Sequence, residues 1–568
     1  MAEGGEALLD GLLASADRER LMAHIGEFAK RVKLSGTAEE LESFRYLEAE
    51  MRGFGYRTAL LSHDAYISLP VSSVLRVDGA EIRSITHSMS RPTGAAGISA
   101  PLVYVGEGGR DDFAGRDVAG KIVLVDGIAV ENVADLASRA GAIGEIHISP
   151  TEHLYEMCIS PVWGSPSQTT RGHLPKTAVV TIPRDEGAAL RARCLAGETV
   201  LASLQTEVDT GWRKTPLLVC DLDAPDGGAD APFVLFSGHH DTWHFGVMDN
   251  GGANATMLEA ARLLAGARAS WRRGLRVCFW SGHSHGRYSG SAWYADEYWA
   301  ELDRRCAAHV NVDSTGAIGA SVLTNSGVVD ELAGLAREVI AAETGQVHAG
   351  RRQGRAADQS FWGVGIPSMF GSLSHQPPGP VKMLTALGWW WHTPHDLADK
   401  IDPDNLVRDT RIVLRTLWAL LARPILPLDY VSYAEALQVE LARIDNDLAG
   451  RFDIAPLRAA AEELGEAARI FGAIAAARAD EARAGALDRV LMHASRHLVP
   501  INYTQGDRFR HDPAVPLPAW LALEPIRALA AEPPASVDLP FHAVDARQAR
   551  NRVLKALKEA TAELRSAQ

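Results

Sequence analysis

The sequence predicts an α/β protein in which a mixed sheet is flanked by helices, with an inserted, mainly β domain and a C-terminal helical domain. Three observations predict this class. Apolar strands alternate with helical segments over residues 216–428, short β-type runs fill residues 71–215, and residues 429–568 are rich in Ala, Glu and Arg. Several domains are expected, because 568 residues exceed what one hydrophobic core usually organises.

Residues 1–70 are expected to belong to the same domain as residues 216–428. They contain two segments with the apolar spacing of amphipathic helices. The first carries Leu21, Ile25, Phe28 and Val32 on one face. The second segment, "TAEELESFRYLEAEMRGFGY", begins with a capping-box signature.

Residues 71–215 change in character. The runs "LVYVG", "KIVLVDG", "EIHIS" and "TAVVTI" are short, β-type and separated by Gly, Asp and Pro. We expect a mainly β domain that contains a helix or two.

Residues 216–428 repeat a strand, loop and helix pattern. The strand-like runs "FVLFSG", "LRVCFWSG", "AHVNVDS" and "IPSMFG" alternate with helical segments such as "ATMLEAARLLAGAR" and "TRIVLRTLWALLA". In sheets of this kind, ligands bind at the strand ends. Polar loops that follow these strands are therefore the expected functional positions.

Residues 429–568 are predicted to be helical. One helical face is apolar and consists of Leu457, Ala461, Leu464, Ala468, Phe471 and Ile474. A face of this width either contacts a partner or packs on its own chain, and the sequence leaves both possibilities open.

Charge and composition narrow the partners. The formal net charge is −14 and no long basic run occurs, so a nucleic-acid partner is disfavoured and a bound cation is favoured. The N-terminus lacks the features of a signal peptide, and no apolar run approaches the ~18 residues of a membrane span. We expect a cytoplasmic protein that does not bind membranes.

The five cysteines are odd in number and lack paired spacing, so they indicate neither a disulfide framework nor a thiolate metal site. A metal in this protein would need nitrogen and oxygen ligands.

The stretch "GHHDTWHFGVMDNGG", residues 238–252, provides such ligands directly after an apolar strand. Imidazole and carboxylate groups are ligand types that zinc and related metals prefer. Later loops add further candidates, which are His283, His285, Asp313, His392 and His395. All of these can reach one edge of a single sheet.

The stretch "FSGHHDTWHFGVMDNGGANATMLEAARLL" resembles the first signature of the co-catalytic di-zinc aminopeptidase and carboxypeptidase family, which includes glutamate carboxypeptidase and the transferrin receptor. "VNVDS" and "WWHTPHD" resemble its later ligand motifs. The resemblance implies a zinc-exopeptidase-like fold, a protease-associated domain at residues 71–215 and a helical dimerisation-like domain at residues 429–568.

The resemblance also implies a ligand set. His239 and Asp313 would hold one divalent metal, most simply zinc, and His285 and His392 would hold a second, with Asp249 bridging the two. Asp241 follows His239 closely in sequence, so it is suitably placed to orient an imidazole or to adjoin it across the site.

One departure from the family pattern changes the expected chemistry. The family has a Glu-Glu pair where this chain has Ser284 and His285, so both the general base and an acidic ligand are absent. His285 can still bind a metal, whereas the Ser284 hydroxyl does not ionise near neutral pH and cannot replace the base. His283 is the nearest group with a suitable pKa, and the other candidates are His240, His244 and His395.

The expected function is that of a homodimeric metallohydrolase, which cleaves a peptide or small amide bond with a hydroxide activated by two metals. The provisional catalytic residues are His283, Ser284 and Asp241. Two alternatives stay open. The protein could hydrolyse a non-peptide carbamate or urea-type substrate, or it could be a non-catalytic binding dimer similar to the transferrin receptor.

Overall fold

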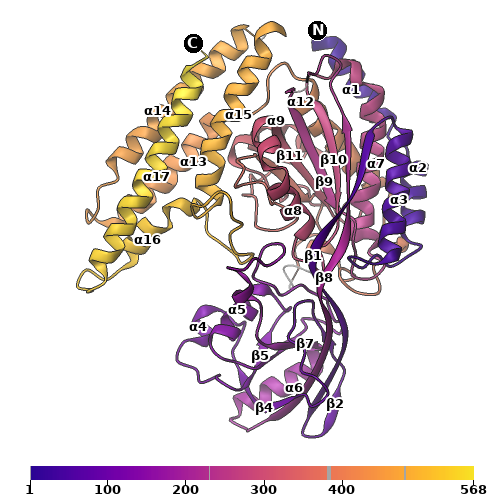
Figure 1. Ribbon diagram of the computed structural model, residues 1–568, viewed down its shortest axis with the longest axis vertical. Coiled ribbons are helices and arrows are strands. Elements are labelled where there is room, and N and C mark those ends of the chain that lie inside the picture. Colours follow the sequence, from indigo (N-terminus) through magenta and orange to yellow (C-terminus); the bar gives the residue numbers. More distant parts are fainter. Residues whose placement is uncertain (1, 229, 380–385, 479–480, 568) are drawn as a thin grey trace.

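The computed structural model describes residues 2–228, 230–379, 386–478 and 481–567. Figure 1 shows a central α/β part, an inserted part below it and a helical part beside it. Two long strands, β1 (Arg57–Val77) and β8 (Leu201–Leu222), run from the central part into the inserted part. One sheet therefore continues through both parts.

The central sheet is mixed. Strands β12 (Ser368–Ser372), β11 (Cys306–Asp313), β9 (Phe233–His239) and β10 (Gly274–Trp280) are neighbours in that order and run parallel. Strand β8 pairs antiparallel with β10 on one side and with β1 on the other. The α/β class and the mixed sheet predicted from the sequence are confirmed.

Helices cover both faces of the central sheet, which explains why its strands are almost continuously apolar. Side chains alternate between the faces: Val234 and Phe236 pack in the core that contains α7, whereas Phe233 and Leu235 pack on the opposite side. One face is covered by α2 (Arg18–Phe28), α3 (Ala38–Gly53), α7 (Ala253–Gly266) and α12 (Pro403–Ala422), and the other by α8 (Ser289–Glu297) and α9 (Trp299–Arg305).

Two further helices complete the central part. Helix α1 (Ala2–Ala14) precedes the two helices predicted near the N-terminus, and α10 (Ala333–Thr344) lies between β11 and β12 in the chain. Asp17 caps α2 by accepting from the amides of Glu19 and Arg20, and Thr37 caps α3 by accepting from the amide of Glu40. The capping signature read from the sequence therefore marks the start of α3.

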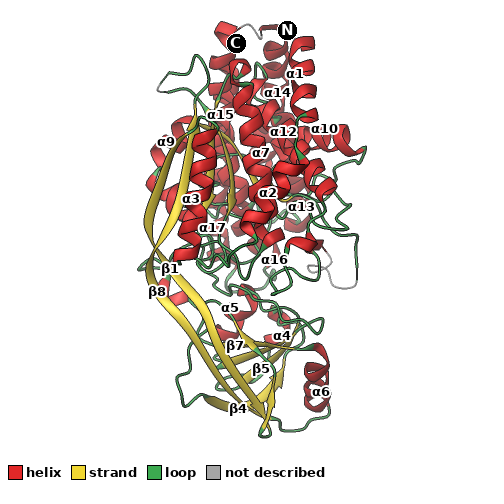
Figure 2. Cartoon of the chain, turned by 90° about the vertical axis from the view of Figure 1, so that its right-hand side faces the viewer, coloured by secondary structure: helices red, strands yellow, loops and turns green. Residues whose placement is uncertain are grey.

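The inserted part is a smaller α/β layer built on the far ends of β1 and β8. Its strands are β2 (Ala80–Ile82), β3 (Ile85–Thr86), β4 (Ile98–Tyr104), β5 (Ile122–Asp126), β6 (Gly144–Ile148) and β7 (Ala178–Ile182). Its helices are α4 (Arg110–Phe113), α5 (Glu131–Arg139) and α6 (Arg184–Leu195). Figure 2 shows the two long strands connecting this part to the rest of the molecule. The domain limits predicted at 70/71 and 215/216 fall inside β1 and β8.

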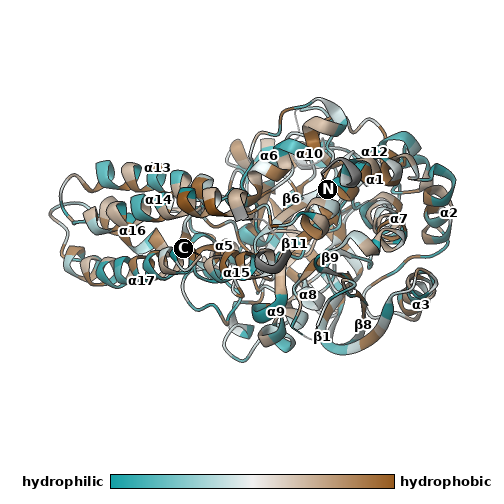
Figure 3. Cartoon of the chain, turned by 90° about the horizontal axis from the view of Figure 1, so that it is seen from above, coloured by the Kyte–Doolittle hydropathy of each residue, from teal (hydrophilic) through white to brown (hydrophobic). Residues whose placement is uncertain are grey.

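The C-terminal part is helical, as predicted. It contains α13 (Tyr430–Leu448), α14 (Ala455–Arg478), α15 (Glu481–Tyr503), α16 (Glu524–Ala531) and α17 (Leu539–Arg565). Figure 3 shows this part projecting from the central part. The apolar face predicted on α14 packs on its own chain, against α13 and α17, and buries Leu457, Ala461, Leu464, Ala468 and Phe471. None of the described helices has the length and hydropathy needed to cross a membrane.

Candidate metal centre

The sequence-predicted ligands lie at one edge of the central sheet. His239 is the last residue of β9 and Asp313 is the last residue of β11, and these two strands are parallel neighbours. Asp249 lies in the segment Val247–Gly252, which leads into α7, and its own backbone is non-helical, with φ −110° and ψ 90°. Because the carboxyl ends of parallel strands meet at the same edge, loops from distant parts of the chain converge there.

Asp249 lies between two imidazoles. Its Oδ1 atom is 3.2 Å from Nε2 of His239, and its Oδ2 atom is 3.1 Å from Nε2 of His392. Nε2 of His239 is also 3.6 Å from Oδ1 of Asp313. A carboxylate that presents one oxygen to each of two imidazoles has the arrangement of a bridging ligand. The structure therefore brings together His239, Asp249, Asp313 and His392.

Hydrogen bonds orient both imidazoles. Nδ1 of His239 donates to the carbonyl oxygen of Asp241 at 2.9 Å, and Nδ1 of His392 donates to the carbonyl oxygen of Glu156 at 2.6 Å. Each ring therefore presents its Nε2 atom to Asp249. Fixing one ring nitrogen through a carbonyl is how proteins set the tautomer of a metal-binding histidine.

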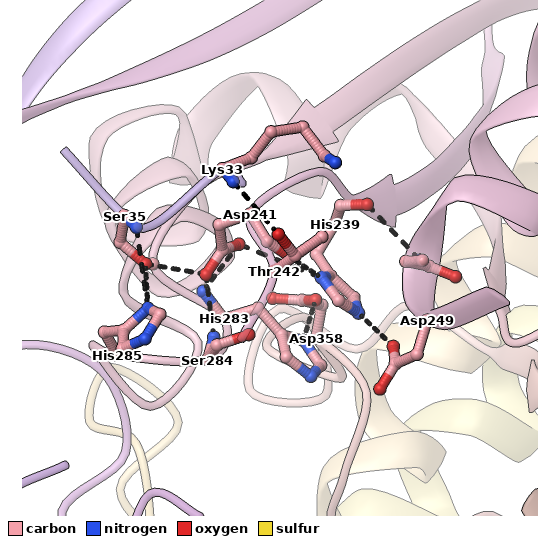
Figure 4. A network of polar contacts seen from close by, with 12 residues as sticks. Lys33, Ser35, His239, Asp241, Thr242, Asp249, His283, Ser284, His285 and Asp358 are labelled. Atoms are coloured by element: carbon pink, nitrogen blue, oxygen red, sulfur yellow. Dashed lines mark hydrogen bonds and ion pairs between the residues drawn. The ribbon is translucent and has the colours of Figure 1, made fainter. Parts of the chain in front are cut away.

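The carboxylate of Asp241 holds the loop that follows β10. It accepts hydrogen bonds from the amides of His283 at 3.2 Å and Ser284 at 2.9 Å, and from Oγ of Ser35 at 2.7 Å (Figure 4). Asp241 thus orients His239 through its carbonyl and the loop through its side chain. An orienting role for Asp241 stays a prediction, and these contacts are the ones it requires.

Asp396 fixes the backbone around the bridging carboxylate. It accepts from the amides of Met248 at 2.8 Å and Asp249 at 3.0 Å. Burial raises the pKa of Asp396 to about 7. Behind the same segment, a Cβ atom on Gly252 would lie 2.3 Å from the carbonyl oxygen of Thr315, so only glycine fits there.

The electrostatics of the cluster indicate a cationic centre. Burial lowers the pKa of His239, but the carboxylates of Asp249 and Asp313 more than offset this effect and hold it well above its ordinary value. Burial raises the pKa of Asp249, but His239 and His392 outweigh burial and hold it well below its usual range. Positive charge in the centre of this cluster is therefore strongly favoured.

His283 stacks on His239, with ring centroids 3.7 Å apart and planes 13° apart. Its Nδ1 atom donates to Oδ2 of Asp358 at 2.7 Å. Among the described residues, one group of His, Cys, Asp and Glu side chains has its ligand atoms all within 4.8 Å of one another, and it consists of His239, His283 and Asp313. The residue predicted as the proton carrier thus lies beside two of the expected ligands, His239 and Asp313.

His285 lies apart from this group. Its Nδ1 atom is 3.0 Å from Oγ of Ser35, and the ring of Trp243 packs against it at 4.5 Å between centroids. Figure 4 shows His285 and Asp249 on opposite sides of the polar network. Nε2 of His285 is buried without a hydrogen-bond partner in the described part of the chain, and burial lowers the pKa of this imidazole to about 4. The ring is therefore neutral.

Ser284 contributes its backbone and not its hydroxyl. The amide donates to Asp241, whereas Oγ is buried and has no hydrogen-bond partner among the residues that the structure describes. Among the described residues, no base therefore contacts this hydroxyl.

The other histidines named from the sequence have separate environments. Nε2 of His240 contacts Oγ of Ser43 at 2.7 Å in the core, and His395 packs on the rings of His153 and Trp389. Nε2 of His244 lies 3.7 Å from Oε1 of Glu156, whose pKa burial raises to about 7. Of these three histidines, His244 is thus the one that faces the carboxylate of Glu156, the residue whose backbone contacts His392.

Sequence reasoning missed Ser35, Glu156, Asp358 and Asp396. Glu156 comes from the inserted part, and its amide donates to the carbonyl oxygen of His392 at 3.1 Å. Only Asp396, four residues after His392 in "HTPHD", carried a local signal. The other three approach the site through tertiary packing, for which the sequence contains no spacing pattern.

The residues present fit a divalent metal. The donor set consists of imidazole nitrogens and carboxylate oxygens, which suit zinc and related ions. In addition, Nε2 of His239 is buried without a hydrogen-bond partner of proper geometry in the described chain, although two carboxylates lie next to it. A cation between these groups satisfies all of them.

The fold and this carboxylate-bridged cluster define the class of metallopeptidase-like α/β hydrolases. Within the chain, residues 222–417 match the sequence model of Peptidase family M28. This part of the protein is therefore a peptidase M28 domain.

Relatives and solved structures are similar over most of the chain. A probable glutamate carboxypeptidase of Arabidopsis thaliana is 21% identical over 83% of this chain and 76% of its own length. An aminopeptidase of Bacillus subtilis is 25% identical over 66% of this chain and 78% of its own length. The solved aminopeptidase from Aneurinibacillus sp. strain AM-1 has a TM-score of 0.55 at 21% identity, covering 72% of this chain and 95% of that chain.

A further solved structure, a Peptidase M28 precursor from Shewanella amazonensis, has a TM-score of 0.57 at 18% identity and covers 74% of this chain and 96% of that chain. These likenesses confirm the zinc-exopeptidase-like fold that the motifs indicated.

Proposed function

We propose that this protein is a metal-dependent hydrolase that cleaves a peptide or small amide bond with the help of two divalent metal ions, zinc being the simplest choice. One observation carries the proposal: Asp249 presents its two oxygens to His239 and His392. The match to Peptidase family M28 supports it, as does the likeness to a glutamate carboxypeptidase and to aminopeptidases.

The protein's own residues hold and orient the reacting groups. His239 and Asp313 would hold one metal, His392 the other, and Asp249 both. When bound, such metals polarise a carbonyl and lower the pKa of water. Asp241, Glu156 and Asp396 keep the ligands in place through the hydrogen bonds described above.

The proposed substrate class depends on the two residues that stand where the resembled family has a Glu-Glu pair. The positions of the Glu-Glu pair hold Ser284 and His285, so the centre carries less negative charge than the family pattern implies. This favours substrates with an anionic or strongly polarised group, and it keeps a non-peptide carbamate or urea-type substrate as a second candidate.

Purified protein should be analysed for bound metal and then offered peptides, small amides, carbamates and ureas. We expect metal-dependent cleavage in the panel, and Asp249→Asn should lose both metal and activity while the surface control Asp404→Asn keeps both. Metal-free protein of full thermal stability that cleaves nothing would instead support a non-catalytic binding dimer.

We also propose that residues 71–215 form a protease-associated domain, and that the protein is a cytoplasmic homodimer. All five cysteines are free, as suits a reducing compartment. The helical part exposes apolar side chains, including Val439 at 74% and Phe541 at 71%, as suits a contact with a second copy. Sedimentation analysis of the wild type and of Val439→Glu tests the dimer.

A further inference from the structure

We infer that His283 is a metal ligand, that Asp358 positions it, and that the two metals of the centre are therefore held unequally. The inference rests on the proposed metal-dependent function and deepens it. By the resemblance to the family, the loop after β10 would supply an acidic ligand at position 285 to the metal held by His392. In this chain, the loop instead brings an imidazole from position 283 to the metal held by His239 and Asp313.

The ligand atoms lie near the spacing that one ion requires. Ligands about 2.0–2.2 Å from a tetrahedral metal lie roughly 3.4 Å from one another. The ligand atoms of His239, His283 and Asp313 all lie within 4.8 Å of each other, and Oδ1 of Asp249 is 3.2 Å from Nε2 of His239. Small side-chain rotations bring these atoms onto one ion.

Asp358 gives His283 the support that a ligand histidine needs. The Asp358 side chain is 1% exposed, and its Oδ2 atom accepts from Nδ1 of His283 at 2.7 Å. Its Oδ1 atom accepts from Oγ of Ser291, on α8, at 2.7 Å. A carboxylate that binds one ring nitrogen fixes the tautomer, so Nε2 of His283 is the nitrogen available to a metal.

His285 lacks a corresponding group of ligands. Its Nε2 atom is buried and has no hydrogen-bond partner in the described chain. However, it does not form a group with two other His, Cys, Asp or Glu ligand atoms of the described chain that all lie within 4.8 Å of one another. Its ring is instead packed by Trp243, and its carbonyl accepts from the amide of Ser68 on β1 at 2.9 Å. His285 therefore holds the loop in place.

The ligand count makes the two metal positions unequal. One has His239, His283 and Asp313 together with the bridging Asp249. The other has His392 and the same bridging carboxylate, and no acidic ligand of its own among the residues that the structure describes. The first position should hold its ion much more tightly than the second.

The test measures metal binding without turnover. Full-length protein is stripped with a chelator, and zinc affinity is measured by competition with a chromophoric chelator, together with the visible spectrum of the cobalt-loaded protein. The variants are His283→Ala, His283→Gln, Asp358→Asn and His285→Ala, with the exposed His395→Ala as a matched imidazole control. Thermal unfolding of the stripped proteins checks that each variant folds.

We expect both His283 variants to weaken the tighter zinc position at least tenfold and to change the cobalt spectrum. Asp358→Asn should weaken it by about 10 to 100 fold. His285→Ala and His395→Ala should leave it within about twofold. Loss of tight zinc in His285→Ala with wild-type affinity in both His283 variants would overturn the assignment.

Failure of this inference is distinguishable from failure of the proposed function. Protein that binds zinc through His283 but cleaves no member of the substrate panel would overturn the function and support the ligand assignment. Protein that cleaves an amide with unchanged zinc affinity in both His283 variants would overturn the ligand assignment alone.

Discussion

At the scale of single residues, one carboxylate organises much of the site. Asp241 contacts His239 through its carbonyl and fixes the amides of His283 and Ser284 through its side chain. The loop after β10 therefore takes its position from the loop after β9. Around this loop, two imidazoles, those of His239 and His392, face the carboxylate of Asp249.

Restoring a glutamate at position 284 should damage the protein. The Ser284 side chain is 2% exposed, and the carboxylate of Asp241 lies 2.9 Å from its amide. A second, unpaired carboxylate buried there costs on the order of several kcal/mol of the free energy of unfolding. Denaturant titration should show Ser284→Glu strongly destabilised and Ser284→Ala close to the wild type. A stable Ser284→Glu variant with increased peptide cleavage would contradict this reading.

At the scale of elements, packing of the turn Asp330–Leu332 against α13 places a carboxyl group in the core. Glu331, in the turn Asp330–Leu332 before α10, accepts from the amide of Asp429 through its carbonyl at 2.8 Å. Its Oε1 atom is buried and has no partner in the described chain, and burial raises the pKa of this carboxyl to about 8.

This group makes stability depend on pH. The folded-state pKa of about 8 lies above the ordinary value of 4.5, so the folded chain keeps this proton up to a higher pH than the unfolded chain does. Below pH 4.5, Glu331 makes its full contribution to the free energy of unfolding. This contribution is lost, at ~1.4 kcal/mol per pH unit, as the pH rises towards 8. Glu331→Gln cannot ionise, so its stability should exceed that of the wild type increasingly between pH 5 and 8.

Denaturant titrations at several pH values measure this difference, with the exposed Glu338→Gln on α10 as the control. Curves of stability against pH that run parallel for Glu331→Gln and the wild type would contradict the assignment.

The sequence predicted most elements because their periodicity is strong. The runs around β9, β10 and β11 and the helices α7 and α12 appeared where expected, as did the apolar face of α14. Local motifs in the sequence also pointed to His239, Asp249, Asp313 and His392, and the structure brings these four side chains together. It could not predict the pairing of His283 with Asp358, because these residues are 75 positions apart and meet only through the packing of α8.

At the scale of the whole molecule, α15 joins the helical part to the central part. Buried Arg496 donates to the carbonyl oxygens of Leu302, Asp303, Gly365 and Cys306. Arg273, the residue before β10, donates through Nε to Oδ2 of Asp488 on α15 at 2.7 Å. Because the two parts also share one hydrophobic core, they should unfold together.

Arg496→Met should test this joint. Methionine has a side chain of similar length but no donor, so four carbonyl groups lose their hydrogen bonds. We expect this to lower the free energy of unfolding by about 3 to 5 kcal/mol. Denaturant titration followed by tryptophan fluorescence and circular dichroism should show a lower midpoint than in the exposed Arg489→Met control. An unchanged midpoint would mean that Arg496 does not hold the two parts together.

Anomalous diffraction at the zinc absorption edge, from crystals grown with zinc, tests the central claim most directly. The account predicts two peaks on either side of the Asp249 carboxylate, the stronger one next to His239 and Asp313 and the weaker one next to His392. Zinc bound elsewhere, with neither oxygen of Asp249 in contact with an ion, would contradict it.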